Sequence, residues 1–213
     1  KSIFKRINTG GLILNNAEIR NAAFYGKATL LLKAIANSSE FIKVTRNKIC
    51  DTRMKAREII NRFLSFYVLG FDEYKNLDDY YDYVLDKLNT YEDSEIDNLK
   101  EKVLKALDAC FNIFGENSFR RLGVNGKFLQ INIPLFECVM CSFVKLYDEN
   151  KNIYDEILKN KNKFLDKYYN LFSDDLFNDI GVSKKCFAKN GVVDETKLID
   201  MLLKDIRSNK IGR

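Results

Sequence analysis

The sequence predicts an all-α protein, built as an irregular bundle of several helices. Its 213 residues include one proline, Pro134, and ten glycines, which leaves few obligatory turns and favours long helices over a β-sandwich. Several segments also repeat apolar residues at intervals of three and four, as an amphipathic helix does. The hydrophobic share of 46% and charged share of 31% are ordinary for a globular domain. No apolar run approaches the ~20 residues needed to cross a bilayer, so no membrane partner is expected.

The first half of the chain carries the clearest helix boundaries. Asn15 and Asn16 offer an N-cap before residues 17–23, and Glu18 lies in the first turn, where the helix dipole favours a negative charge. Further helices are predicted at residues 28–36, after a cap at Ser38 and Ser39, at 54–69 ending at Gly70, and at 77–91. From Phe63 to Leu69 the central helix is apolar on every side, which predicts burial all round.

Two charged features accompany these helices. Arg62 begins the apolar run and needs a partner if buried, and Glu58, one turn earlier, is the natural candidate. In the helix at 77–91, four aspartates occupy the face opposite the apolar residues: Asp78, Asp79, Asp82 and Asp86. Such a group could hold a cation, but it lacks the alternation and glycine turn of an EF-hand. We therefore interpret the four aspartates as a solvated acidic face.

The second half continues the helical pattern. Helices are predicted after a cap at Ser94 up to Phe114, after a cap at Asn132 through 134–146, at 152–172 and from Asp194 onward. The last of these has its apolar residues at Leu198, Ile199, Leu202, Leu203 and Ile206. Residues 116–129 are predicted as a long loop with a basic patch formed by Arg120, Arg121 and Lys127. Strand signals are confined to residues 128–131 and 192–193.

Cysteine and histidine usage limits the chemistry. Five cysteines at irregular spacing suggest reduced thiols in a cytoplasm. Cys138 and Cys141 have the spacing of a metal or redox pair, but a zinc site needs about two more ligands, so they are interpreted as buried core thiols. The chain has no histidine, which excludes an HNH nuclease centre, a serine or cysteine nucleophile paired with histidine, and histidine metal sites. No catalytic or metal-binding residue is predicted.

A basic segment follows the third predicted helix and extends into the first turn of the fourth. It gathers Arg46, Lys48, Arg53, Lys55 and Arg57, with only Asp51 opposing them. Two interpretations remain open: a solvated basic face, or a surface that faces phosphates, because the arginine fork suits phosphate oxygens. The net charge of +5 is mild, so it is compatible with a DNA partner without arguing for one.

The stretch at residues 3–20 looks like a signature. Its matches to the motif Phe-x-x-x-Asn-x-x-Gly-x-x-Leu-x-x-x-Glu-x-Arg are Phe4, Asn8, Gly11, Leu14, Glu18 and Arg20, and Asn21, Ala22 and Gly26 extend them. A second segment comprises Cys50, Asp51, Thr52, Arg53 and Met54, followed by Arg57, Glu58 and Arg62 to Leu64. Over about the first 70 residues the chain resembles the GmrSD-type family, the domain-of-unknown-function family numbered 262. The resemblance assigns structural-motif roles to Phe4, Glu18, Arg20, Asp51, Arg53, Glu58 and Arg62.

The resemblance also implies a domain organisation. In this family a nucleotide domain similar to ParB and sulfiredoxin carries an Asp-Gly-Gln-Gln-Arg motif upstream of the signature, and these 213 residues lack that motif. Residues 1–36 are therefore expected to be the trailing end of an incomplete nucleotide domain, and residues 37–213 the helical domain. The expected parent is a restriction protein of phage defence that uses GTP or another nucleoside triphosphate with Mg²⁺, engages DNA and works with a nuclease domain or subunit. The fragment alone is expected to be inactive.

The candidate nucleotide contacts are Asn8, Thr9, Gly10 and Gly11. They form a turn just before a helix N-terminus, whose unpaired N–H groups attract anions. Glu18 would repel a phosphate there, so its expected role is to hold Arg20 or Arg53. An alternative reading from the residues alone is a non-catalytic helical scaffold or protein-interaction module.

Overall fold

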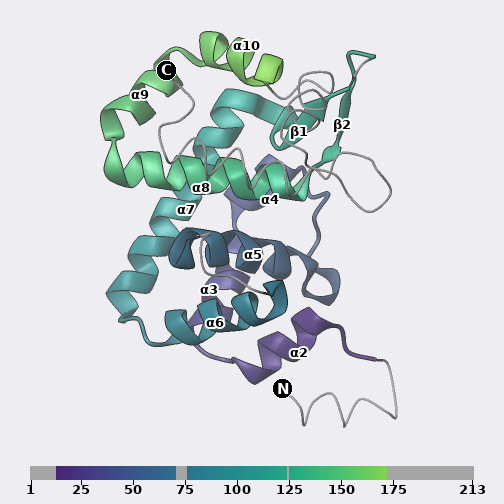
Figure 1. The fold of residues 1–213 in the computed structure, drawn as a ribbon, viewed down its shortest axis with the longest axis vertical. Helices are drawn as coiled ribbons and strands as arrows, with labels where there is room; N and C mark the ends of the chain where they lie inside the picture. Colours follow the sequence, from purple (N-terminus) through teal and green to yellow (C-terminus); the bar gives the residue numbers. More distant parts are fainter. Residues whose placement is uncertain (1–12, 71–75, 124, 172–213) are drawn as a thin grey trace. The chain divides into compact units, whose positions relative to one another are not determined.

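The all-α prediction is confirmed by the computed structural model, which describes residues 13–70, 76–123 and 125–171 (Figure 1). Within these ranges the only sheet has two strands. The helices are α2 (Asn16–Ala23), α3 (Lys27–Ala36), α4 (Ser39–Thr45), α5 (Lys55–Leu69), α6 (Leu77–Asn89), α7 (Asp93–Phe114), α8 (Ile133–Glu149), α9 (Lys151–Lys159) and α10 (Lys161–Leu171), with short 3₁₀ turns at Thr52–Met54 and Gly115–Asn117. The chain forms two compact units, Lys1–Asp108 and Ala109–Arg213, here called the first and second units.

The core of the first unit lies where α3, α5 and α6 pack on one another. Ile60, Phe63 and Leu64 of α5 are fully buried there, which confirms the burial predicted for the start of the apolar run. The prediction is wrong for the end of the run, because residues 67–69 are only half-buried. Gly70 ends α5 with φ of 89°, a backbone conformation that glycine adopts without the steric cost of a side chain. The first unit is thus organised around α5.

The predicted caps mostly hold. Asn15 caps α2, and Ser38 caps α4 by accepting from the Phe41 amide. The cap predicted at Ser94 is wrong: α7 begins at Asp93, and the Ile96 amide already donates to the Glu92 carbonyl. The Glu95 carboxylate accepts from the Glu92 amide, which fixes the start of the helix two residues earlier.

The N-terminus of α3 is completed by a residue distant in sequence. Gly26 precedes α3, and the Asn89 side chain, at the end of α6, accepts from the Ala28 amide and donates to the Phe24 carbonyl. A Cβ at position 26 would lie 2.5 Å from Asn89 Oδ1. The missing side chain of Gly26 is therefore what admits the Asn89 amide.

In the second unit, the prediction of a long loop at residues 116–129 is wrong. Strands β1 (Arg120–Leu122) and β2 (Phe128–Ile131) pair antiparallel, with Arg120 opposite Ile131 and Leu122 opposite Phe128. The Gly123 amide donates to the Lys127 carbonyl, and Gly126 has a φ of 71°, so the two glycines close the hairpin. The strand signal at 128–131 is confirmed.

Helix α8 is the buried helix of the second unit. Asn132 caps it, and Pro134 lies in its first turn, as predicted. Cys138 and Cys141 are buried on it among apolar residues, which confirms their assignment to the core. Around α8, Phe143 meets the rings of Phe114 and Phe164, and the Phe114 ring also lies 4.6 Å from that of Tyr168.

The single helix predicted at 152–172 is broken in the structure. Asn160 has φ of −109° and ψ of 34°, outside the helical region, so α9 ends before it and α10 begins after it. Its amide still donates to the Glu156 carbonyl and its carbonyl accepts from Phe164. The predictions at residues 192–193 and from 194 onward lie outside the described residues, and a boundary after residue 36 stays a prediction.

Candidate functional site

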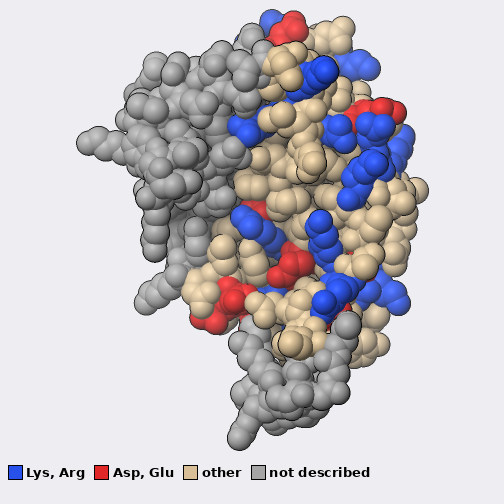
Figure 2. Space-filling model, turned by 90° about the vertical axis from the view of Figure 1, so that its right-hand side faces the viewer, with Lys and Arg blue, Asp and Glu red and all other residues tan. Residues whose placement is uncertain are grey.

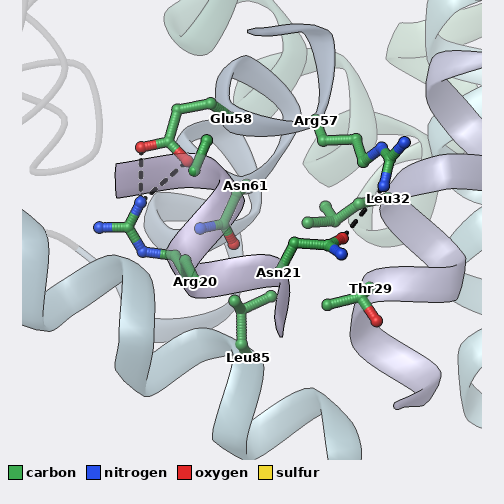
Figure 3. A pocket seen from close by; sticks show the side chains of 9 residues that line it. Arg20, Asn21, Thr29, Leu32, Arg57, Glu58, Asn61 and Leu85 are labelled. Atoms are coloured by element: carbon green, nitrogen blue, oxygen red, sulfur yellow. Dashed lines mark hydrogen bonds and ion pairs between the residues drawn. The ribbon is translucent and has the colours of Figure 1, made fainter. Parts of the chain in front are cut away.

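Arg20, on α2, is the centre of a buried ion-pair network in the first unit. Arg20 is buried, with only 1% of its surface exposed to solvent. Nη1 donates to both Glu58 oxygens at 2.7 and 2.9 Å, Nε donates to Asp82 at 2.8 Å, and Nη2 donates to Asp78 at 2.8 Å. The guanidinium carbon also lies 5.2 Å from the centre of the Tyr81 ring. Arg20 therefore joins α2 to α5 and α6 at once (Figure 3 shows Arg20 and Glu58).

The network carries more negative than positive charge. One guanidinium faces three carboxylates, so the sum of +1 and −3 is −2. Burial raises the pKa of Glu58, and the neighbouring charges of Asp78 and Asp82 raise it further, against the lowering effect of Arg20. Burial opposes the charge of Arg20, but the Glu58 and Asp82 carboxylates raise its pKa overall. Arg20 thus stays charged, and Glu58 takes up a proton more readily than an ordinary glutamate does.

This network corrects one prediction and extends another. The expected solvated acidic face is wrong for Asp82, whose side chain is only 18% exposed and binds Arg20. Asp78 is exposed as predicted, but it also binds Arg20. Sequence reasoning pairs Glu58 with Arg62 on the same helix and does not anticipate Arg20, which lies 38 residues earlier. Arg62 itself lies half-buried on α5.

A second network fastens the N-terminus of α2. Of the two partners offered for Glu18, the structure shows Arg53, which donates to its carboxylate at 2.8 and 3.2 Å and also to the Ile13 carbonyl. In return, the Asn15 side chain donates to the Arg53 carbonyl, and Asn15 and Glu18 bond each other reciprocally as a capping box. The hydrogen bond from Arg53 lowers the pKa of Glu18. We call Ile13, Asn15, Glu18 and Arg53 the α2 clamp.

The backbone of the α2 clamp is unusual at Arg53. Arg53 and Met54 have φ of 53° and 62°, and Arg46 and Asn47, in the same connection, have 53° and 54°. Non-glycine residues rarely adopt this left-handed region, and each such residue carries a steric cost. At Arg53 this cost is offset by hydrogen bonds, because its side chain donates to Glu18 and its carbonyl accepts from the Asn15 side chain.

The basic segment around Asp51 is partly neutralised. Arg57 donates to Asp51 from Nε at 2.6 Å and from its backbone amide at 3.1 Å, and its Nη1 donates to Asn21 on α2. Lys48 and Lys55 are exposed. Figure 2 shows lysine and arginine side chains spread over the face it draws, with fewer acidic ones between them. The solvated basic face and the phosphate-facing surface both stay predictions for this segment.

A small pocket lies beside Arg20 (Figure 3). Its polar lining includes Asn21, Thr29, Arg57 and Asn61, and its volume of about 10 Å³ has room for about one water molecule. Asn61 is buried, and its Oδ1 accepts no hydrogen bond from the residues that the structure describes. The pocket is too small for a nucleotide, so it is a polar packing gap between helices.

No group of three or more histidine, cysteine, aspartate or glutamate residues in the described ranges is arranged to hold a metal ion. Burial raises the pKa of the Cys110 thiol far above its ordinary value, so it is no thiolate nucleophile. The charged side chains of both networks have their partners within the unit. Phe4 and the candidate nucleotide contacts Asn8, Thr9, Gly10 and Gly11 lie outside the described residues.

Comparison with known proteins gives no relative for this chain: no family model, no curated protein and no solved structure matches it. In the described part of the chain, no helix combines the length and apolar character needed to cross a membrane.

Proposed function

We propose that this chain is the helical portion of a GmrSD-like, nucleotide-dependent restriction protein of phage defence. Its own role in that protein is structural: it holds the segment in front of α2 in the geometry that nucleotide binding requires. It hydrolyses no nucleotide and cuts no DNA by itself. The parent protein, in a cytoplasm, supplies the nucleotide domain, uses GTP or another nucleoside triphosphate with Mg²⁺, and acts on DNA with a nuclease domain or subunit.

One observation supports this proposal above the others. The resemblance rests on two sequence segments, one at residues 3–26 and one at 50–64. In the structure the matched residues of one segment bind those of the other: Glu18 with Arg53, Arg20 with Glu58, and Asn21 with Arg57. A chance likeness in two separate segments gives no reason for such mutual pairing.

The α2 clamp gives the proposal a mechanism. Arg53 binds the Ile13 carbonyl and the Glu18 carboxylate, so it fixes the direction in which the chain enters α2. The turn predicted at residues 8–11 comes shortly before this entry in the sequence. Phosphate oxygens would accept from the backbone N–H groups of Gly10 and Gly11 and from the side chains of Asn8 and Thr9. Glu18, held by Arg53, would be kept from facing the phosphates.

The test uses the protein together with its upstream nucleotide domain. Asn8→Ala is expected to weaken binding of GTP with Mg²⁺ in calorimetry while the melting temperature stays close to that of the parent. The matched control is Asn98→Ala, an exposed position on α7, which should change neither quantity. Normal nucleotide binding by the Asn8→Ala protein would contradict the proposal and make the turn a purely structural cap.

The alternative is a non-catalytic helical scaffold or protein-interaction module outside any restriction system. The closed ion-pair networks fit it equally, because they need no ligand. The sequence encoded upstream of Lys1 separates the two: an Asp-Gly-Gln-Gln-Arg motif supports the restriction protein, and an unrelated sequence supports the scaffold. Turnover of GTP or ATP by the chain alone, above a mock preparation, would contradict both.

A further inference from the structure

The corner between α9 and α10 forms an open groove of about 350 Å³ in the second unit. Its apolar lining comes from Ile153 and Ile157, one turn apart on α9, and from Phe164 on α10. Ile153 is 43% exposed, so part of this apolar lining is open to solvent. The break at Asn160 creates the groove, because it bends α10 away from the line of α9. An apolar strip in a concave corner is the shape that receives an amphipathic helix.

The rim of the groove is mainly basic. Lys163 and Lys167 are one turn apart on α10 and both are exposed, whereas Glu156 is the one acidic residue of the lining. Neither lysine forms an ion pair with a described residue. An occupant that fits this groove would have an apolar stripe with carboxylates along its edge.

The chain itself contains such a sequence. In residues 194–207 the apolar residues recur at helical spacing, at Leu198, Ile199, Leu202, Leu203 and Ile206. On a helix, at 100° per residue, Asp194 and Asp205 would fall along one edge of that stripe, and Glu195 would lie in line with it at its N-terminal end. Lys197 and Lys204 would fall on the opposite side, away from any surface that the stripe covers. The charge pattern of the segment is therefore complementary to that of the groove.

The segment also begins within reach of the groove. Leu171 is the last residue of α10, so the 22 residues 172–193 connect the groove's own helix to residue 194. At about 3.3 Å per extended residue they can span about 70 Å. A tether of this kind gives a short segment a high effective concentration at a nearby surface. We infer that residues 194–207 of this chain bind the α9–α10 groove, with Leu198, Leu202 and Ile206 against Ile153, Ile157 and Phe164.

The experiment is amide hydrogen exchange, read by mass spectrometry, on the full chain. Ile153→Asp places a charge in the groove at a half-exposed position, where it does not threaten the fold. We expect exchange in residues 198–206 to become about tenfold faster, while exchange in α8 stays unchanged. Asn152→Asp is the matched control, because the same new residue stands one position away, outside the groove lining, and should leave residues 198–206 as in the parent.

A charge exchange provides the second arm. Lys167→Asp should speed exchange in residues 198–206, and adding Asp205→Lys to it should restore part of the protection. Exchange in residues 198–206 that is equally fast in the parent and in Ile153→Asp would overturn the inference. Protection that rises with protein concentration would overturn it as well, in favour of a second copy of the chain in the groove.

Discussion

The two units hold their helices together by different means. In the first unit α2 joins the core through charge, with Arg20 bound to three carboxylates of α5 and α6. In the second unit α10 joins α8 and the last residues of α7 (109–114) through rings, with Phe164 against Phe114 and Phe143. The charged contacts are directional, because a guanidinium offers its donors in a fixed fork. The ring contacts of Phe164 occur at interplanar angles from 29° to 85°, so they fix the alignment of the helices less strictly.

This difference bears on what each unit can specify. A buried ion network adds little net stability over an apolar core, but removing one member leaves unpaired buried charge. We interpret the Arg20 network as fixing which face of α2 meets α5 and α6. The aromatic cluster supplies burial with less demand on alignment. The stability of the first unit should therefore respond more to substitutions that change charge. The stability of the second unit should respond more to substitutions that change side-chain volume.

The largest effect is expected from volume in the second unit. Phe136 of α8 is 1% exposed and packs edge-on against Phe119 at 4.7 Å between ring centres. Phe136→Ala should lower the free energy of unfolding by about 3–5 kcal/mol, the range for emptying a buried aromatic site. Urea unfolding followed by circular dichroism measures it. Phe136→Leu should recover most of the loss, and the loss should not depend on salt.

A smaller effect is expected from charge in the first unit. Arg20→Leu leaves three carboxylates facing one another, but Glu58 and Asp78 are partly exposed, so water relieves part of the repulsion. We expect a loss of roughly 2–3 kcal/mol in the same assay, partly reversed by added salt. The loss for Arg20→Lys should be smaller than that for Arg20→Leu, because lysine keeps the positive charge but lacks the planar fork of donors. A salt-independent loss would remove the contrast between the two units.

The smallest expected effect is a pH dependence. The pKa of Glu58 is higher in the folded protein than in the unfolded chain, so the folded state holds its proton longer. The stabilisation from that proton is fully present below the ordinary glutamate pKa of 4.5 and is lost as pH rises through the higher folded value. As pH rises from 4.5, the melting temperature of the parent should therefore fall relative to that of Glu58→Gln.

Glu101 provides the control of opposite sign. A hydrogen bond from Lys105, on the same exposed helix face, lowers the pKa of Glu101. Its stabilisation is present above the ordinary pKa and is lost as pH falls through the lower folded value. Glu101→Gln should therefore differ from the parent above pH 4.5 in the opposite direction. The same trend in both variants would mean that the Arg20 network holds no excess negative charge.

Much of the helical structure could be read from local sequence. Asn15, Ser38 and Asn132 cap helices through bonds to residues three positions away, and Gly70 ends a helix by its own conformation. The hairpin at 120–131 was missed because its pairing depends on contacts across the turn, which apolar periodicity does not reveal. The break at Asn160 was missed because the apolar pattern continues across it.

The candidate site shows the same division. The capping box of Asn15 and Glu18 is local, and the repulsion expected between Glu18 and a phosphate suggested Arg20 or Arg53 as its partner, of which the structure shows Arg53. The binding of Asp78 and Asp82 by Arg20 spans about 60 residues, and nothing in the aspartate pattern distinguishes it from a solvated face. Two signals together could have predicted this network. One is the recurrence of acidic residues at i and i+4 on a helix, and the other is an arginine on the apolar face of another helix.

Gly26 and Asn89 have a consequence for how the first unit opens. The Ala28 amide at the start of α3 is satisfied by a side chain at the far end of α6, 61 residues later. If the last turn of α6 frays, α3 loses its cap at the same moment, and the Phe24 carbonyl loses its donor. The two helix ends therefore belong to one cooperative opening event, although the sequence separates them. By leaving room for the Asn89 amide, Gly26 thus couples the opening of two helix ends that lie far apart in the sequence.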